Sequence, residues 1–258
     1  MLNQRDLTRP AVARNGRIAP VLVPLMAALL LAATPALAQS TDGAQALRAP
    51  SPLKIDGDLG DWAFAKDSAI TLDSQAQLTP GADSPDTWSG PADLSATIYV
   101  AYDDTNLYLA YDVRDDKVVQ QFSGDQIYNG DGPELYLDFT PDGQAAAYDN
   151  NVWQFGFTPG TDAAAPAWVL YQQVQGRSID PSAVKVAAQR TANGYTMEVA
   201  IALSALGQTL QPGHVIHFDV AVNDVDNTSA TATENQIILS RAADGWQNPS
   251  VFVPLTIR

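Results

Sequence analysis

Three aspartates in one short segment are the residues whose spacing most directly suggests chemistry. Residues 55–62 read IDGDLGDW, so Asp56, Asp58 and Asp61 lie around two glycines and the segment ends at Trp62. Carboxylates in this arrangement could bind Ca²⁺ if backbone carbonyls supplied the remaining oxygen ligands. Turn formation and helix capping explain the same residues without a metal, because an aspartate side chain accepts hydrogen bonds from nearby backbone N–H groups. Both interpretations stay open at this point.

Asn223 and Asp224 form a second candidate calcium site, together with Asp226 in the segment NDVDN. The acidic residues of the whole chain are almost all aspartate, with 26 Asp against 3 Glu. Aspartate favours turns and offers oxygen ligands to hard cations, whereas charge on helices would normally include much glutamate. A structural Ca²⁺ is therefore a candidate cofactor.

A pair of carboxylates could instead serve acid–base catalysis, as in glycoside hydrolysis. Glu134 with Asp131 or Asp138 is the pair that the sequence offers. The spacing of Glu134 and Asp138 follows simply from the alternation of a strand. No Ser/His/Asp order, P-loop or HExxH motif occurs in the sequence. We therefore expect a protein that is not an enzyme.

A haem-binding redox domain is a further alternative, because methionine, histidine or lysine side chains can serve as axial ligands. Met197 is the one methionine after residue 38, and no CxxCH motif occurs. Met197 also lies on a strand face that is expected to point into the core. His214 and His217 are three residues apart on a predicted strand, so they point to opposite faces and cannot share a metal.

The first 38 residues have the features of a secretory signal peptide. Four arginines precede an apolar stretch over 21–37, and residues 36–38 (Ala-Leu-Ala) form a small-x-small cleavage site. The apolar stretch contains two prolines and is short for a membrane span, which needs about 20 apolar residues. We expect cleavage after Ala38 and a periplasmic or extracellular protein without a membrane span in the mature chain. Residues 39–51 are expected to be a polar linker, and residues 52–258 a single domain.

Charge restricts the partners of the mature chain. The whole chain carries −15, and the leader contributes +3 through four Arg and one Asp, so the remainder carries −18. Nucleic acids and anionic membrane surfaces are poor partners for such a surface, whereas neutral ligands and cations are suitable. The chain has no cysteine, so a domain in an oxidising compartment must be stabilised by its core. The sequence does not define an oligomeric state.

Short β-rich runs separated by Asp, Asn, Gly and Pro indicate an all-β domain. The runs are 94–102, 106–113, 133–140, 152–157, 167–175, 183–190, 194–203, 215–223, 236–240 and 251–257. Helical patterns are confined to short turns. About ten strands predict an antiparallel β-sandwich of the jelly-roll or immunoglobulin-like kind. Residues 71–93 are expected to be a long loop that contains Trp88.

Alternation along two strands predicts which side chains face the core. On one strand the inward residues are Leu135, Leu137 and Phe139. Glu134, Tyr136 and Asp138 on the same strand are expected to face out. On another strand the inward residues are Tyr195, Met197, Val199 and Ile201.

Six motifs, in order, resemble the family 9 carbohydrate-binding modules over nearly all of residues 52–258. They are IDGDLGDW (55–62), YVAYDDTNLYL (99–109), DGPELYLD (131–138), GYTMEVAI (194–201), FDVAVND (218–224) and WQNPS (246–250). The resemblance implies a sugar-binding β-sandwich, often with structural calcium. Any link to glycosidic hydrolysis would then run through attached or partner enzymes.

The resemblance also implies a binding site. In this family two aromatic rings sandwich a sugar while polar side chains bond its hydroxyls. Tyr128 and Trp246 fall on the two stacking positions, and Glu134 falls on a hydroxyl-binding glutamate. The chemistry is reasonable, because a pyranose presents an apolar C–H face to an aromatic ring and a carboxylate orients hydroxyls through charge-assisted hydrogen bonds. The implied partner is a neutral oligosaccharide or polysaccharide.

Three positions depart from the family pattern. Gly156 replaces an arginine, Ala221 a glutamine and Ala243 an asparagine. The sequence therefore predicts a sugar-binding module whose aromatic groups are retained and whose hydrogen-bonding groups have changed. Alternatives are a cell-envelope structural or interaction domain that has lost sugar binding, and the haem-binding domain considered above.

Overall fold

The computed structural model describes residues 43–258 except 81–87, 142, 162 and 172–173. The described residues all belong to one compact unit. The expected signal peptide and the first residues of the expected linker lie outside the described part. Within that part, no helix has the length and apolar character needed to cross a bilayer.

The described residues contain thirteen strands and six short 3-10 helices, so the domain is all-β as expected. The strands are β1 (Ala44–Arg48), β2 (Ile70–Leu72), β3 (Leu78–Pro80), β4 (Leu94–Tyr102), β5 (Asn106–Asp115), β6 (Gly132–Asp138), β7 (Val152–Thr158), β8 (Ala167–Leu170), β9 (Val184–Thr191), β10 (Gly194–Ala202), β11 (Val215–Asp224), β12 (Asn235–Ile238) and β13 (Val253–Ile257). The helices are η1 (Leu59–Ser68), η2 (Gln75–Gln77), η3 (Gly124–Asn129), η4 (Pro181–Ala183), η5 (Leu203–Ala205) and η6 (Pro249–Val251).

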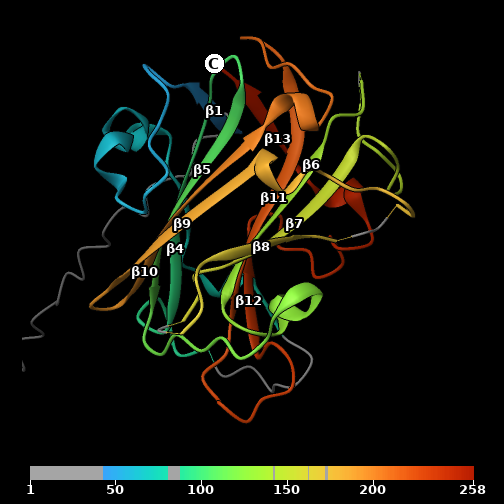
Figure 1. Cartoon of the computed structure of the whole chain (residues 1–258). Helices are drawn as coiled ribbons and strands as arrows, with labels where there is room; N and C mark the ends of the chain where they lie inside the picture. Colours follow the sequence, from blue (N-terminus) through green and yellow to red (C-terminus); the bar gives the residue numbers. More distant parts are fainter. Residues whose placement is uncertain (1–42, 81–87, 142, 162, 172–173) are drawn as a thin grey trace, which may run out of the picture. The chain divides into compact units, whose positions relative to one another are not determined.

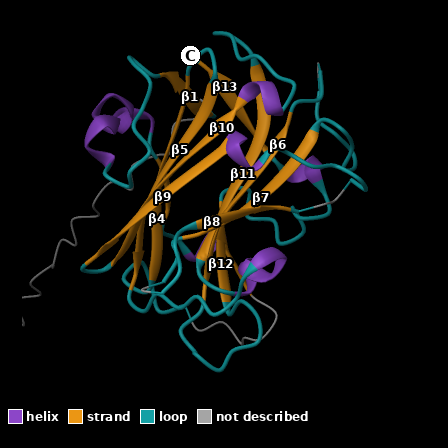
Figure 2. Cartoon of the chain, in the orientation of Figure 1, coloured by secondary structure: helices purple, strands orange, loops and turns teal. Residues whose placement is uncertain are grey.

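The strands form two sheets that share strand β1 (Figure 1, Figure 2). One sheet has the order β8-β7-β6-β11-β13-β1, and the other has the order β1-β4-β5-β10-β9. β12 pairs with both β11 and β3, and β2 pairs with β4. Ala44 to Ala46 pair with β13, whereas Leu47 and Arg48 pair with β4. A strand that changes sheets in this way closes one side of the sandwich.

The expectation of an entirely antiparallel sandwich of about ten strands needs correction. All ten expected strands are present, and β1, β2 and β3 are added to them. Both pairings of β1 are parallel, and the other named pairings are antiparallel. β1 lies inside the expected linker, and β2 and β3 lie inside or at the edge of the expected loop. These strands are short, and their conformation depends on distant partners rather than on local pattern.

Trp88, expected in a long loop, is attached to the domain. Its ring packs partly buried against the main core cluster, and its indole N–H donates to the Leu94 carbonyl at 2.9 Å.

The main core lies between the two sheets, and the predicted inward faces are confirmed. Leu135, Leu137 and Phe139 belong to this core. So do the four alternating residues of β10, namely Tyr195, Met197, Val199 and Ile201. The burial of Met197 within a packed apolar core gives no support to its use as an axial haem ligand.

The other face of β6 is buried as well, contrary to expectation. Glu134 is 5% exposed, Tyr136 2% and Asp138 0%. The Tyr136 ring packs against Phe252, with centroids 5.5 Å apart, and Asp138 accepts hydrogen bonds from the N–H groups of Thr140 and Ala145. Loops thus form a layer over the outside of this sheet. Alternation predicted the correct faces, but it could not show that the second face would be covered.

The IDGDLGDW segment forms a turn that is anchored by Glu198. One carboxylate oxygen of Glu198 accepts from the backbone N–H groups of Asp56 and Gly57, at 2.9 and 2.7 Å. The other accepts from the indole N–H of Trp62 at 2.8 Å. Asp58 caps η1 by accepting from the Gly60 N–H. Turn and cap chemistry therefore accounts for this segment, with Trp62 as a buried anchor.

We predict that Glu198→Ala destabilises the domain by about 2–4 kcal/mol. The substitution leaves one buried indole N–H and two backbone N–H groups without an acceptor. Urea unfolding followed by circular dichroism measures the change. Asp67→Ala is the control, because Asp67 is exposed in the adjoining helix η1 and should change stability by no more than about 0.5 kcal/mol. Equal stability of the two variants would contradict the anchoring role.

Candidate functional site

A pocket of about 440 Å³ lies on the covered face of the β6–β11 sheet. Its floor comes from strands β6, β7, β11 and β12, and its walls come from helix η3 and from loops. The three residues that the sequence singled out for ligand binding, Tyr128, Glu134 and Trp246, all line this pocket. The remaining lining residues are Thr79, Asn129, Tyr136, Gln154, Tyr171, Asn223, Ala232, Thr233, Gln236, Ile238, Ala242, Ala243 and Gly245.

Two exposed aromatic rings lie at the rim. Tyr128 is 42% exposed and Trp246 is 51% exposed, and among the described residues only Val215 joins them as an exposed large hydrophobic side chain. Single exposed rings are common on protein surfaces, but two that line one pocket mark a candidate ligand-binding groove. A turn holds Trp246 outward, because the backbone N–H groups of Gln247 and Asn248 both donate to the Asp244 carbonyl.

Glu134 is the charged group at the floor. Its carboxylate accepts from the Tyr136 hydroxyl at 2.8 Å, from Gln154 Nε2 at 2.9 Å and from Asn223 Nδ2 at 2.8 Å. Asn223 Oδ1 in turn accepts from Gln236 Nε2 at 2.7 Å. Four strands thus contribute polar groups to one network, and the hydrogen bonds fix the orientation of the carboxylate.

Asn223, which the sequence offered as a calcium candidate, lines the pocket. Both polar ends of its side chain are used in the network around Glu134. Sequence reasoning also missed Gln154. The register explains its position, because Gln154 pairs with Tyr136 across β6 and β7, and its neighbour Phe155 lies on the core face.

The three departures from the family pattern have distinct structural consequences. Tyr171 covers Gly156 so closely that a Cβ at position 156 would lie 2.4 Å from the Tyr171 hydroxyl oxygen. Ala221 is fully buried in an apolar cluster, and Ala243 lines the pocket. Tyr171 also meets the Tyr128 ring edge-on, with centroids 5.9 Å apart. A tyrosine thus fills the space next to position 156, and no local sequence pattern indicates this contact.

Glu134 influences the pKa values of three nearby tyrosines. Burial first, and the charge of Glu134 second, raise the pKa of the hydroxyls of Tyr136, Tyr148 and Tyr171. The three phenols are therefore neutral donors or acceptors in the ordinary pH range.

A buried aspartate triad lies outside the pocket. Asp115 ends β5, Asp131 precedes β6 and Asp224 ends β11, and each offers a carboxylate oxygen within 4.8 Å of the others. Burial and then the neighbouring carboxylates raise the pKa of Asp115 to about 6 and that of Asp224 to about 8, and they raise that of Asp131 as well. Asp115 Oδ2 and Asp224 Oδ1 are buried without a hydrogen-bond partner. Such a group of hard oxygen atoms fits a cation.

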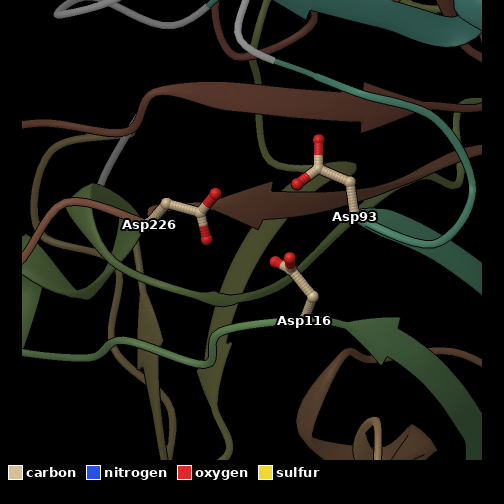
Figure 3. A group of neighbouring side chains, drawn as sticks. All are labelled: Asp93, Asp116 and Asp226. Carbon is tan, nitrogen blue, oxygen red and sulfur yellow. The ribbon is translucent and has the colours of Figure 1, made fainter.

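A second triad consists of Asp93, Asp116 and Asp226, and its carboxylate oxygens also lie within 4.8 Å of one another. Figure 3 shows the three carboxyl groups turned toward a common space. This triad is more exposed than the first, with only Asp93 buried. Of the sequence candidates for calcium, Asp224 falls in the buried triad and Asp226 in the second triad.

Asp56, Asp58 and Asp61 were the other calcium candidates, and none belongs to a metal-competent group among the described residues. Asp56 pairs with Lys54, and Asp61 accepts from the Lys54 backbone N–H at 3.2 Å. These carboxylates are therefore engaged in hydrogen bonds and an ion pair.

The carboxylates considered for catalysis do not form a pair in the pocket. Asp131 belongs to the buried triad, and Asp138 is used to hold the backbone at Thr140 and Ala145. Glu134 is the one acid among the residues that line the pocket in the described part of the chain. This arrangement suits binding by stacking and hydrogen bonding.

The fold and the pocket together define a β-sandwich binding module with an aromatic-rimmed site. A family model described as "Carbohydrate family 9 binding domain-like" matches residues 55–257. The chain therefore belongs to this family, whose members are binding modules.

Solved structures share the fold. One is a carbohydrate-binding module of family 9 from Caldicellulosiruptor kristjanssonii in complex with glucose, with 18% identity, a TM-score of 0.60, and coverage of 83% of this chain and 95% of that one. Another is described in the same words in complex with cellotriose, with 18% identity, a TM-score of 0.59, and coverage of 83% and 93%. No curated protein matched the sequence.

Asp219 lies buried on β11, and burial raises its pKa to about 7. Its Oδ1 accepts from the Val220 and Ser240 N–H groups, which partly offset the cost of ionisation. In the unfolded chain an aspartate ionises near pH 4. Between these two values the folded state holds a proton that the unfolded state has released. This residue therefore lowers stability as the pH rises from about 4 to about 7.

We predict that Asp219→Asn gains stability relative to the wild type as the pH rises from about 4 to about 8. The gain is at most about 4 kcal/mol, because about three pKa units separate the two states. Urea unfolding of the variant and the wild type at both pH values measures the difference in their free energies of unfolding. The titration of other groups cancels in this difference. A difference that does not change with pH would show that Asp219 titrates normally in the folded state.

Proposed function

We propose that this chain is a non-catalytic module that binds a neutral oligosaccharide or polysaccharide in the pocket lined by Tyr128, Glu134 and Trp246. The main support is that Tyr128 and Glu134, which are close in sequence, line a single pocket with Trp246 from a distant part of the chain. The family membership and the sugars named for the two similar structures agree with this function.

The proposed mode of binding follows from the chemistry of the rim and the floor. Tyr128 and Trp246 offer exposed rings to the C–H face of a pyranose. Glu134, already oriented by neutral donors, has acceptor capacity left for a sugar hydroxyl. Tyr171 and Gln236 add neutral polar groups to the lining. These groups take the place of the polar side chains absent at positions 156, 221 and 243.

We also propose that the chain is exported, with residues 1–38 removed as a signal peptide, and that it acts in the periplasm or outside the cell. The absence of cysteine from the whole sequence is compatible with that location, because the fold then needs neither thiols nor disulfides. Glycoside hydrolysis would belong to an attached or partner enzyme.

We further propose that the buried triad of Asp115, Asp131 and Asp224 holds a structural Ca²⁺. The triad joins the ends of β5 and β11 to the start of β6, and its unpartnered buried oxygens are otherwise unfavourable. A divalent cation would neutralise their mutual repulsion and tie the strand ends together.

We predict that Trp246→Ala weakens sugar binding by about 1–3 kcal/mol, because a large apolar surface is lost from the site. Isothermal titration calorimetry with glucan- and xylan-type oligosaccharides measures the affinity. Val215→Ala is the matched control, since Val215 is an equally exposed apolar residue that does not line the pocket. Absence of heat with every sugar at millimolar concentration would refute the proposed function and favour a structural role in the cell envelope.

We predict that Ca²⁺ at about 100-fold its dissociation constant raises the melting temperature by about 5–10 °C relative to a chelator. Asp224→Asn should abolish this response, because it removes one charged ligand from the triad. Asp61→Asn is the control and should keep the response. Loss of the response in Asp61→Asn alone would move the site back to the opening turn.

A further inference from the structure

The pocket contains a negative charge and no positive one. Glu134 is the acidic lining residue, and the described residues that line the pocket include no Lys, Arg or His. The other polar lining groups are amides and hydroxyls, which are neutral. The electrostatic environment of a bound ligand is therefore set by one fixed carboxylate.

The hydrogen-bond donors of the Glu134 carboxylate in the described part of the chain are all uncharged. Glu134 is 5% exposed, and these three donors come from Tyr136, Gln154 and Asn223. A carboxylate offers about four acceptor positions, so about one remains for a ligand. A buried charge without a counter-charge is costly, and a cationic ligand group would recover part of that cost.

Position 156 excludes a cationic side chain from the floor. Gly156 pairs with Glu134 across β6 and β7, so a side chain there would be a direct neighbour of the carboxylate. The Tyr171 ring fills that space, as the 2.4 Å approach of a Cβ to its hydroxyl oxygen shows. An aromatic ring therefore occupies the space from which a cationic side chain at position 156 could neutralise Glu134.

The pocket walls add a second attraction for a cation. Tyr128, Tyr171 and Trp246 contribute three aromatic rings to the pocket lining. The face of each ring carries negative electrostatic potential, and cations within about 6 Å of such a face are stabilised. An aromatic wall above a carboxylate floor is suited to an ammonium group attached to an apolar ring.

We propose that the pocket selects pyranoses that carry a protonated amino group, such as 2-amino-2-deoxyhexose units, over neutral pyranoses. The inference rests on the proposed function, since it concerns which sugar the same site prefers. The sugar ring stacks on the rim aromatics as any pyranose would. The ammonium donates to the remaining acceptor position of Glu134 and lies near the aromatic faces.

Calorimetric titration of the protein at pH about 6 with glucosamine, glucose and N-acetylglucosamine tests this preference. Glucosamine should bind about tenfold more tightly than the two neutral sugars, a ratio that one ion pair with cation–π contact can supply. A fully deacetylated chitosan tetrasaccharide and its acetylated counterpart form a second pair. A preference in the tetrasaccharide pair alone would identify the ligand as a polymer. A preference in both pairs would identify it as a single amino-sugar unit.

Two substitutions test the origin of the preference. Glu134→Gln removes the charge at nearly constant volume and should reduce the ratio of glucosamine to glucose affinity to about one. Ala243→Lys places a positive charge on an exposed lining residue and should lower glucosamine affinity more than glucose affinity. Gln247→Lys adds the same charge at an exposed residue that does not line the pocket, and it should leave the ratio unchanged. Thermal melting of each variant verifies folding.

The outcomes separate the two proposals. Equal affinities in both pairs, of glucosamine with glucose and of the chitosan tetrasaccharide with its acetylated counterpart, would overturn the amino-sugar inference and leave the proposed function standing. Binding of none of the sugars would overturn both. A preference for glucosamine that persists in Glu134→Gln would also overturn the inference, because the charge on Glu134 would then not be its source.

Discussion

The alternation of strand β6 is the constraint on which the rest of the structure depends. Leu135 and Leu137 on one face pack into the core between the sheets, and Glu134 and Tyr136 on the other face form the floor of the pocket. A shift of one residue in the register of β6 would exchange these faces, placing the carboxylate in the core and leucines in the pocket. The pairing of β6 with β7 and β11 therefore fixes the apolar core and the pocket floor together.

The acidic residues of this protein serve three separate purposes. Glu198 anchors the opening turn through three N–H donors, while Glu134 is held by side chains at the pocket floor. The triad of Asp115, Asp131 and Asp224 has unpartnered oxygens and mutual repulsion, which distinguishes it from both. Burial is common to all of these groups, and the available partners determine whether a carboxylate is structural, ligand-facing or suited to a cation.

Much of the fold and part of the site could be predicted. Ten strands followed from β-rich runs and turn residues, and Tyr128, Glu134 and Trp246, expected from their resemblance to family positions, all line one pocket. Strand β1 could not be predicted, because its five residues are held in place by pairing with β13 and β4. β13 lies at the C-terminal end of the sequence, and β4 is also distant from β1 in the sequence. The two aspartate triads could not be predicted for a related reason, because each joins residues from separate strand ends.

The sequence by itself determined the all-β class, the inward faces of the strands, the acidic character and the family resemblance, because these depend on residue type and short-range periodicity. Only the tertiary structure decided that the second face of β6 is covered, that Tyr171 fills the space beside Gly156, and that Asn223 serves Glu134. Each of these is a contact between strands or loops distant in sequence. Such contacts depend on sheet order and loop packing, which local pattern does not encode.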